Sequence, residues 1–139
     1  MIDKSKIRLT EDRKFNREEL LELYQLNEWS SVKKPELLIK ALKNSHTLIL
    51  AFYNDKLVGL GNALSDGYLA VYYSHMLVHP DFQGLGIGTM IMNRFQEIYG
   101  DFHQQVLIAD GKAVDFYKKC GFERAGKTEP MWKFQGDEH

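Results

Sequence analysis

The sequence contains few of the residues and patterns that mark several large classes of protein. Its 139 residues include one cysteine, Cys120, so an internal disulfide cannot form, and the paired cysteine spacing of a zinc or redox motif is missing. Lysine and arginine, 18 in number, nearly balance 19 aspartates and glutamates, and the net charge of −1 provides no field to hold nucleic acid or an anionic membrane. We therefore expect no metal, no nucleic acid and no membrane as a partner.

Long hydrophobic runs are also missing. No stretch approaches the roughly 18 consecutive apolar residues of a membrane span, and residues 1–10 alternate charged and apolar side chains instead of forming the apolar core of a secretion signal. Together with the single cysteine, this predicts a cytoplasmic protein. Apolar residues are nevertheless plentiful, at 44% with 12% aromatic, which is enough for one core in a single domain over residues 1–139.

The spacing of the apolar residues predicts an α+β domain with a mostly antiparallel, twisted sheet. Apolar positions three and four apart indicate helices, and short apolar runs between turn residues indicate strands. In chain order, the patterns predict a strand at 7–10, helices at 17–28 and 35–42, strands at 47–53, 56–64 and 68–78, a helix from Gly86 to Gly100, a strand at 105–109, a helix from Ala113 that Gly121 ends, and two final strands at 122–125 and 131–134.

The segment from Val78 to Thr89 carries the most chemical information. A strand leads through a turn fixed by Pro80 into three glycines at alternate positions, Gly84, Gly86 and Gly88, and then directly into a helix. The start of a helix presents unpaired N–H groups and about half a positive charge, and glycine lets a phosphate approach the backbone without a Cβ in the way. The pattern predicts a pyrophosphate cradle; the alternative is that the glycines serve only a sharp strand-to-helix turn.

Two nucleotide-binding motifs do not fit this segment. A Rossmann fingerprint has the spacing G-x-G-x-x-G in a first β-α-β unit, whereas the spacing here is G-x-G-x-G, past mid-chain and after an antiparallel meander. A Walker loop requires a lysine before Ser or Thr, and Gly88-Thr89 lacks it. Affinity for ATP or NAD is therefore the weaker expectation.

Two motifs together resemble the signatures of one family. Gln83-Gly84-Leu85-Gly86-Ile87-Gly88 resembles the Q/R-x-x-G-x-G/A signature with which GNAT acyltransferases hold the pyrophosphate of acyl-CoA. Residues 110–122, DGKAVDFYKKCGF, resemble the second signature of that family, N-x-x-A-x-x-F-Y-x-x-x-G-F. The expected element order is also that of the GNAT fold, whose sheet splays between the strands expected here at 68–78 and 105–109. Within the superfamily, the chain looks most similar to small bacterial and plastid N-acetyltransferases.

The resemblance implies an acetyl-CoA-dependent N-acetyltransferase and assigns roles to individual residues. Tyr117 matches the tyrosine that protonates the departing CoA thiolate, and a phenol of pKa near 10 keeps its proton at pH 7. The alternative for Tyr117 is a core aromatic residue beside Phe116. The full set implied to bind the cosubstrate is Met76, Leu77, Val78, Gln83, Gly84, Leu85, Gly86, Ile87, Gly88, Thr89, Asp110, Phe116 and Tyr117.

The chain departs from the family pattern at Asp110, where the second signature has asparagine. This carboxylate could cap the last helix, hold the cosubstrate or act as a catalytic base near the amine, and the residues leave these roles open.

A second departure concerns the base that receives the proton of the amine. Several relatives place Glu or His on the strand before the glycines, but strict alternation puts Tyr72, Ser74 and Met76 on the relevant face and His75 on the opposite one. His79 falls in the turn. Both histidines are therefore expected to be structural or solvated, with the proton leaving through water, Asp66 or Asp110.

The acceptor is expected to be a cationic primary amine with an apolar body, either a small molecule or a lysine or N-terminal amine. Its binding residues are predicted to be Trp29, Asp66, Tyr72 and Ser74, in a pocket completed by residues 30–32, 65–68 and 131–132. A homodimer is also expected, because family members often pair near their C-terminal strands. The alternative function is a non-catalytic domain that binds acyl-CoA for regulation.

Overall fold

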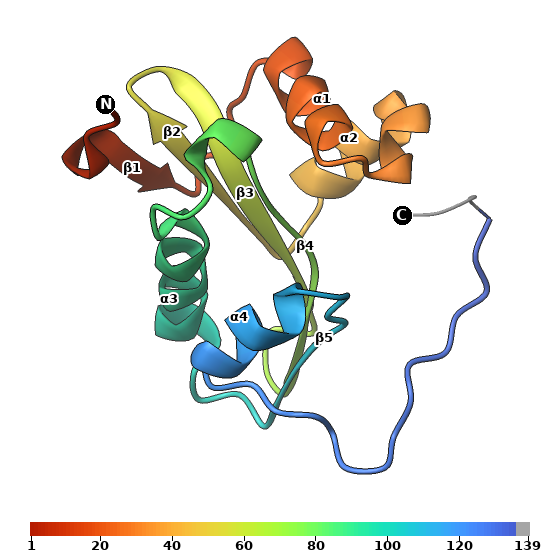
Figure 1. Ribbon diagram of the computed structural model, residues 1–139. Coiled ribbons are helices and arrows are strands. Elements are labelled where there is room, and N and C mark those ends of the chain that lie inside the picture. Colours follow the sequence, from red (N-terminus) through yellow and green to blue (C-terminus); the bar gives the residue numbers. More distant parts are fainter. Residues whose placement is uncertain (136–139) are drawn as a thin grey trace.

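The computed structural model describes residues 1–135, which form one five-stranded sheet with helices on both faces (Figure 1). The strands are β1 (Ile7–Thr10), β2 (Thr47–Tyr53), β3 (Lys56–Ser65), β4 (Ala70–Val78) and β5 (Gln104–Leu107). They lie in the order β1-β2-β3-β4-β5; the first three pairings are antiparallel, and β4 pairs with β5 in parallel. The expected mixed architecture and strand direction are therefore confirmed.

The helices are α1 (Arg17–Leu26), α2 (Pro35–Lys43), α3 (Ile87–Tyr99) and α4 (Ala113–Lys119), with 3-10 turns η1 (Lys4–Lys6), η2 (Ser30–Lys33) and η3 (Pro80–Phe82). Local sequence sets their ends: the side chain of Asn16 accepts the N–H of Glu19 at the start of α1, and Pro35 opens α2. In the part of the chain that is described, none of these helices has the length and apolarity to cross a bilayer.

The prediction of two final strands, at 122–125 and 131–134, is wrong: no strand follows α4 in the described residues. A local turn replaces them, because Gly126 adopts a φ of +61° and the N–H groups of Gly126 and Thr128 donate to the carbonyls of Arg124 and Ala125. These hydrogen bonds close within the segment instead of reaching β5. Beyond the turn the chain leads away from the sheet and is exposed through residue 135 (Figure 1).

Each face of the sheet has its own apolar core. α3 covers one face with a cluster that includes Ile91 and Phe95, and α1 and α2 cover the other with a cluster that includes Leu23 and Leu42. α3 lies very close to the sheet at Gly61, where an added Cβ would stand 2.8 Å from Cγ2 of Ile91 and 2.9 Å from Cε2 of Phe95. The absence of a side chain at Gly61 therefore sets the depth at which α3, and the turn before it, sit on the sheet.

Candidate functional site

A gap opens between β4 and β5 partway along the sheet. The two strands pair only from Ala70↔Gln104 to Tyr73↔Leu107, whereas β4 continues to Val78, and no strand of the described residues pairs with it there on that side. The N–H of His79 donates to the carbonyl of Val58 on β3, so alternation turns the backbone of Leu77 toward β3 and that of Met76 and Val78 toward the gap. This is the expected splay, and its geometry favours Met76 and Val78 over Leu77 for backbone pairing with an extended ligand.

Two side-chain amides hold the end of β4 at this gap. Nε2 of Gln83 and Nδ2 of Asn27 each donate to the carbonyl of Val78, both at 3.1 Å, and Nδ2 of Asn27 also donates to the carbonyl of Leu23 in α1. Gln83 therefore acts here by fixing the strand end. Sequence reasoning missed Asn27, because its partner lies 51 residues away and no local motif identifies it.

The glycine turn before α3 has both features expected of an anion cradle. Gly84 and Gly86 have φ of +79° and +84°, in the left-handed region that only glycine enters at little cost, and an added Cβ at either would meet nothing within 4 Å. Gly86 stands at the start of α3, and no side chain caps that helix. The turn thus requires Gly84 and Gly86 for its backbone, and the open space in front of them is compatible with the predicted cradle.

Gly88 has a different role from the other two. It lies within α3, and an added Cβ would stand 3.1 Å from Cζ of Phe116, which is tighter than ordinary van der Waals contact. Its missing side chain lets α4 approach α3. The third glycine of the motif therefore serves helix packing and places the Phe116-Tyr117 pair beside the turn.

Tyr117 lies half-buried between two aromatic rings, with centroids 5.0 Å from Phe116 and 6.0 Å from Phe122. Burial raises the pKa of Tyr117 to about 12, with a smaller contribution from the neighbouring thiol of Cys120. The phenol is therefore fully protonated at neutral pH. The ring of Tyr117 also packs against the apolar core between α3 and the sheet, so it contributes to the stability of the fold.

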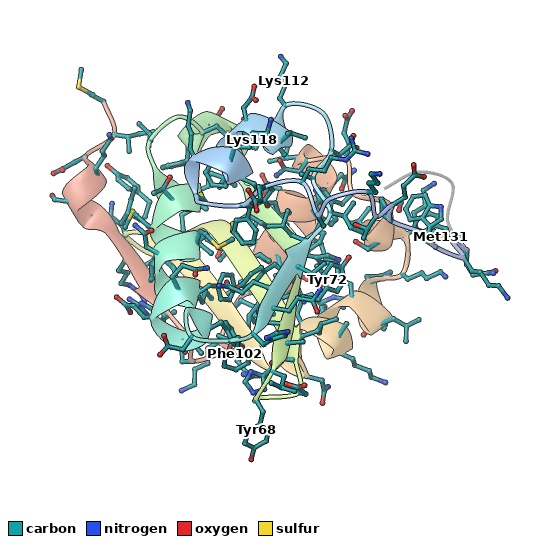
Figure 2. All side chains as sticks on the ribbon, turned by 90° about the horizontal axis from the view of Figure 1, so that it is seen from below. Tyr68, Tyr72, Phe102, Lys112, Lys118 and Met131 are labelled. Atoms are coloured by element: carbon teal, nitrogen blue, oxygen red, sulfur yellow. The ribbon has the colours of Figure 1, made fainter. Side chains whose placement is uncertain are left out.

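Asp110 is exposed at the loop before α4. Its backbone carbonyl accepts the N–H of Ala113. Lys112 is the N-cap residue of α4, and no side-chain hydrogen bond caps this helix. The structure thus places Asp110 at the start of the helix through its backbone. Figure 2 shows Lys112 extending outward at this end of the molecule.

A β-bulge in β4 changes the direction of its side chains. Leu64 on β3 pairs with Tyr72 and Asn62 pairs with His75, so Tyr73 and Ser74 together stand opposite one residue, Ala63. An extra residue of this kind reverses the alternation beyond it.

The contacts of the side chains show the reversal. Tyr73 and Met76 both pack on the α3 side, whereas Leu77 belongs to the α1 and α2 core and His75 contacts Tyr24 of α1. The prediction that His75 faces away from Tyr72 is therefore wrong, because it assumed an unbroken strand. Tyr72 and His75 share the α1 side of the sheet, and Met76 lies on the other.

The expected acceptor residues occupy this α1 side at two levels. The ring of Trp29 lies 4.7 Å from that of His75, and Ser74 donates to the side-chain oxygen of Asn62 at 2.8 Å. Further along β4, a shallow hollow of about 450 Å³ is lined by Leu64, Ser65, Asp66, Ala70, Val71, Tyr72 and Val106. Tyr72 is labelled on β4 in Figure 2, whereas Met131 extends from the exposed C-terminal segment.

Asp66 has a structural role in the turn beside the hollow. Its Oδ1 accepts the N–H groups of Tyr68, Leu69 and Ala70 at 2.8, 2.8 and 3.2 Å, and these hydrogen bonds lower the pKa of the carboxyl group. The carboxylate therefore remains charged while it holds the β3–β4 turn.

Comparisons with known proteins agree with this geometry. A family model described as "Acetyltransferase (GNAT) domain" matches residues 11–131. A protein named "Uncharacterized N-acetyltransferase ycf52" from Pyropia yezoensis is 36% identical over 84% of this chain and 70% of its own length. A GNAT family acetyltransferase from Streptococcus pneumoniae has a TM-score of 0.80 at 29% identity, covering 93% of this chain and 98% of that one.

A more distant structure has the same fold with a ligand bound. It is AAC(6')-Iy in complex with a CoA bisubstrate analogue, with a TM-score of 0.71 at 13% identity over 92% of this chain and 98% of that one. The matches in sequence and the two motifs, set on a splayed five-stranded sheet, show that the chain belongs to the GNAT family of acetyl-CoA-dependent acetyltransferases.

Proposed function

We propose that the protein transfers the acetyl group of acetyl-CoA directly to a primary amine, with Tyr117 as the general acid. The observation that supports this most strongly is a protonated phenol, with its pKa raised to about 12, on the helix that Gly88 lets approach the glycine turn. A domain that only binds acyl-CoA has no need for such a proton donor.

The residues present fit acetyl-CoA as cosubstrate. The open glycine turn and the N–H groups at the start of α3 would hold the pyrophosphate, and the backbone of Met76 together with the N–H of Val78 would pair with the pantetheine arm in the gap. Leu85 lies between the two turn glycines, and Thr89 lies in the first turn of α3. The side chain of Ile87 is buried in the core, so this residue would contribute its backbone alone.

The reaction requires one proton donor and one proton acceptor at this site. The amine nitrogen forms a bond to the acetyl carbon, the carbon–sulfur bond breaks, and the electron pair leaves with sulfur. Tyr117 donates its proton to that sulfur, and a base removes a proton from the nitrogen. Because the phenol is poorly solvated, its proton is held until negative charge develops beside it.

The hollow beside β4 supports an amine with an apolar body as the acceptor. Its lining is mainly apolar, with Tyr72 and Val106 exposed at 36% and 38%, and the anionic Asp66 stands at its rim. The ring of Trp29 packs against that of His75 on the same side of the sheet. An arylalkylamine, a polyamine or a lysine side chain matches this combination of apolar surface and negative charge.

The proposed compartment is a reducing one, and the cytoplasm is our first proposal. Cys120 is a free cysteine. A relative from Arabidopsis thaliana, 34% identical over 57% of this chain, has the name "GCN5-related N-acetyltransferase 3, chloroplastic", so a plastid is the second proposal.

An acceptor screen tests the proposed function. Purified protein is incubated with acetyl-CoA and panels of amines, amino acids and peptides, and free thiol is measured together with the acetylated product. In parallel, CoA should raise Tm while ATP and NAD leave it unchanged, because only a ligand that binds the native state stabilises it. A CoA shift without thiol release on any amine would favour the regulatory acyl-CoA-binding domain, and equal shifts from all three ligands would remove the acyl-CoA assignment.

A further inference from the structure

We propose that Asn27, the C-cap residue of α1, is a further binding residue for acyl-CoA, and that its Oδ1 accepts an amide N–H of the pantetheine arm. This deepens the proposed function and rests on its acyl-CoA site alone. The inference starts at Val78, the last residue of β4, whose backbone faces the gap between β4 and β5. Asn27 reaches that backbone from α1, outside both sequence motifs.

The carbonyl of Val78 is fully occupied by side chains. A backbone carbonyl has two lone pairs, and Nδ2 of Asn27 and Nε2 of Gln83 each donate to this one at 3.1 Å. A strand-like partner in the gap would ordinarily take the N–H of Val78 and give an N–H to its carbonyl. A ligand along β4 can therefore receive the N–H of Val78, but its own N–H at this level needs a different acceptor.

The partners of Asn27 determine which way its amide is turned. Nδ2 also donates to the carbonyl of Leu23 at 2.9 Å, and carbonyl oxygens only accept, so the NH2 group faces both carbonyls and Oδ1 faces away from them. Asn27 is partly buried, and no donor among residues 1–135 is bonded to its Oδ1. Within those residues, Oγ of Ser31 is the one side-chain polar atom that is buried without a partner, so Oδ1 of Asn27 reaches solvent. An acceptor for an N–H is therefore available beside the occupied carbonyl.

The end of α1 holds this amide in place. The N–H groups of Glu28 and Trp29 donate back to carbonyls of the last helical turn at 3.0 and 3.1 Å, and Glu28 has a φ of +60°, the left-handed conformation with which helices commonly end. With its backbone fixed by this turn and its Nδ2 held by two carbonyls, Asn27 loses little freedom when a ligand binds. Gln83 is exposed and its Nε2 donates to Val78 alone, so its Oε1 is the less ordered acceptor.

The pantetheine arm has the matching chemistry. It is an extended chain with secondary amides, and each amide offers one N–H donor and one carbonyl acceptor, the same groups that a strand presents. Val78 donates its N–H to a carbonyl of the arm, and Oδ1 of Asn27 accepts an N–H that the carbonyl of Val78 cannot take. The contact joins α1 to the cosubstrate that lies along β4.

The test measures binding by calorimetry with CoA and with 3′-phospho-ADP, which is the nucleotide end of CoA without the arm. We expect Asn27→Ala to raise Kd for CoA by about 3–10-fold, the effect of losing one neutral hydrogen bond, and to leave Kd for 3′-phospho-ADP within about twofold. The melting temperature of each variant without ligand shows that it is folded.

The matched control is Asn44→Ala. Asn44 is the C-cap residue of α2, and its Nδ2 donates to the carbonyl of Lys40 at 2.8 Å, the same capping bond that Asn27 makes to Leu23. In the described residues it has no hydrogen bond to β4. Asn44→Ala should therefore leave both dissociation constants unchanged.

Asn27→Lys separates the accepting oxygen from the donors that hold Val78. A lysine at the end of a helix donates to its last carbonyls, and its ammonium group accepts no hydrogen bond. Since the added charge attracts the phosphates of both ligands, the quantity compared is the ratio of Kd for CoA to Kd for 3′-phospho-ADP. We expect this ratio to rise as it does in Asn27→Ala. A wild-type ratio in Asn27→Lys would mean that Asn27 acts only by holding the strand, and would overturn the proposal.

Two further outcomes would overturn it. Equal rises in Kd for CoA and for 3′-phospho-ADP would trace the effect to a displaced glycine turn, and a raised KM for the amine with an unchanged Kd for CoA would assign Oδ1 of Asn27 to the acceptor. The proposed function fails separately. Wild-type protein that binds CoA and releases no thiol with any amine overturns acetyl transfer, while the binding comparison still decides the role of Asn27. Wild-type protein that does not bind CoA overturns both.

Discussion

Single residues in this domain often serve structure and chemistry at once. Tyr117 packs between Phe116 and Phe122 and is also the proposed acid. Asp66 is predicted to bind the acceptor, and its Oδ1 also accepts three N–H groups of its own turn. Only the three-dimensional structure separates these roles, because an aspartate before a glycine in a loop looks the same in the sequence whether it binds a ligand or holds its own turn.

At the residue scale, Tyr117→Phe should lower kcat by about 10²–10⁴-fold, since it removes the acid and keeps the ring. Affinity for CoA, measured by the Tm shift or by calorimetry, should stay within about twofold by the same reasoning. Tyr68→Phe is the control, because Tyr68 is 85% exposed and points away from the body of the protein (Figure 2). Wild-type turnover in Tyr117→Phe, with chemistry rate-limiting, would leave Tyr117 a packing residue.

The pH profile offers a second test of the same residue. The folded pKa of Tyr117 is raised to about 12, so its proton is present at lower pH and is lost only as pH rises through that value. We therefore expect no alkaline fall in kcat from this group up to pH ~10. A limb between pH 8 and 10 that disappears in Tyr117→Phe would show that the phenol ionises far more readily than its burial indicates.

At the scale of elements, the sequence predicted what local pattern determines. The order of strands and helices from Ile7 to Lys119 follows from apolar period, turn residues and helix ends, and the structure confirms it. Two features depend on partners far along the chain and were not predictable in this way. The bulge in β4 is held by Asn62 on β3, and the region after Gly121 forms a local turn where strands were expected.

The packing of α4 on α3 gives a prediction at this scale. Gly88→Ala places a Cβ 3.1 Å from Phe116, and overpacking of this kind costs ~1–3 kcal/mol, against a gain of up to ~1 kcal/mol for alanine over glycine in a helix. We expect Gly88→Ala alone to lower the free energy of unfolding by about 1 kcal/mol and to weaken CoA binding.

The control reverses the sign. In a Phe116→Leu background the contact is relieved, so the same Gly88→Ala change should leave the free energy of unfolding unchanged or raise it. Urea denaturation measures this free energy in both backgrounds. Equal destabilisation in both backgrounds would mean that Phe116 is not what Gly88 accommodates.

The molecule as a whole holds several phenols away from water. Burial raises the pKa of Tyr24, Tyr73, Tyr99 and Tyr117 above the ordinary value of 10.0. The folded state therefore keeps protons that the unfolded chain loses above pH ~10, so stability is intact below that pH and falls as pH rises. We expect Tm to decline above pH 10, and less steeply in Tyr117→Phe. A Tm that stays constant to pH 11 would contradict the raised values.

The whole molecule also presents an uncovered sheet edge. Within residues 1–135, β5 is the last strand in the sheet order and pairs with β4 alone. Ile108, directly after it, is 53% exposed, and the apolar side chains of the C-terminal segment are exposed as well, at 93% for Met131, 65% for Trp132 and 39% for Phe134. Trp132 and Phe134 stack with centroids 4.5 Å apart. An open strand edge and a group of exposed aromatic residues are each typical of a surface that pairs with another chain.

We therefore predict a two-fold symmetric dimer that buries the β5 edge together with residues 131–134 of each copy. A symmetric interface brings the same patch of both subunits together, so one substitution acts twice.

Ile108→Lys should disfavour pairing, because a lysine beside a strand edge must be desolvated there. The control is Leu37→Lys, a position at least as exposed, at 62%, that belongs to α2, and Figure 1 shows α2 apart from β5. Light scattering at micromolar concentration should give twice the chain mass of 16.1 kDa for the wild type and for Leu37→Lys, and the chain mass for Ile108→Lys. A wild-type mass of 16.1 kDa would contradict the dimer, and a dimer that persists in Ile108→Lys would place the interface elsewhere on the protein.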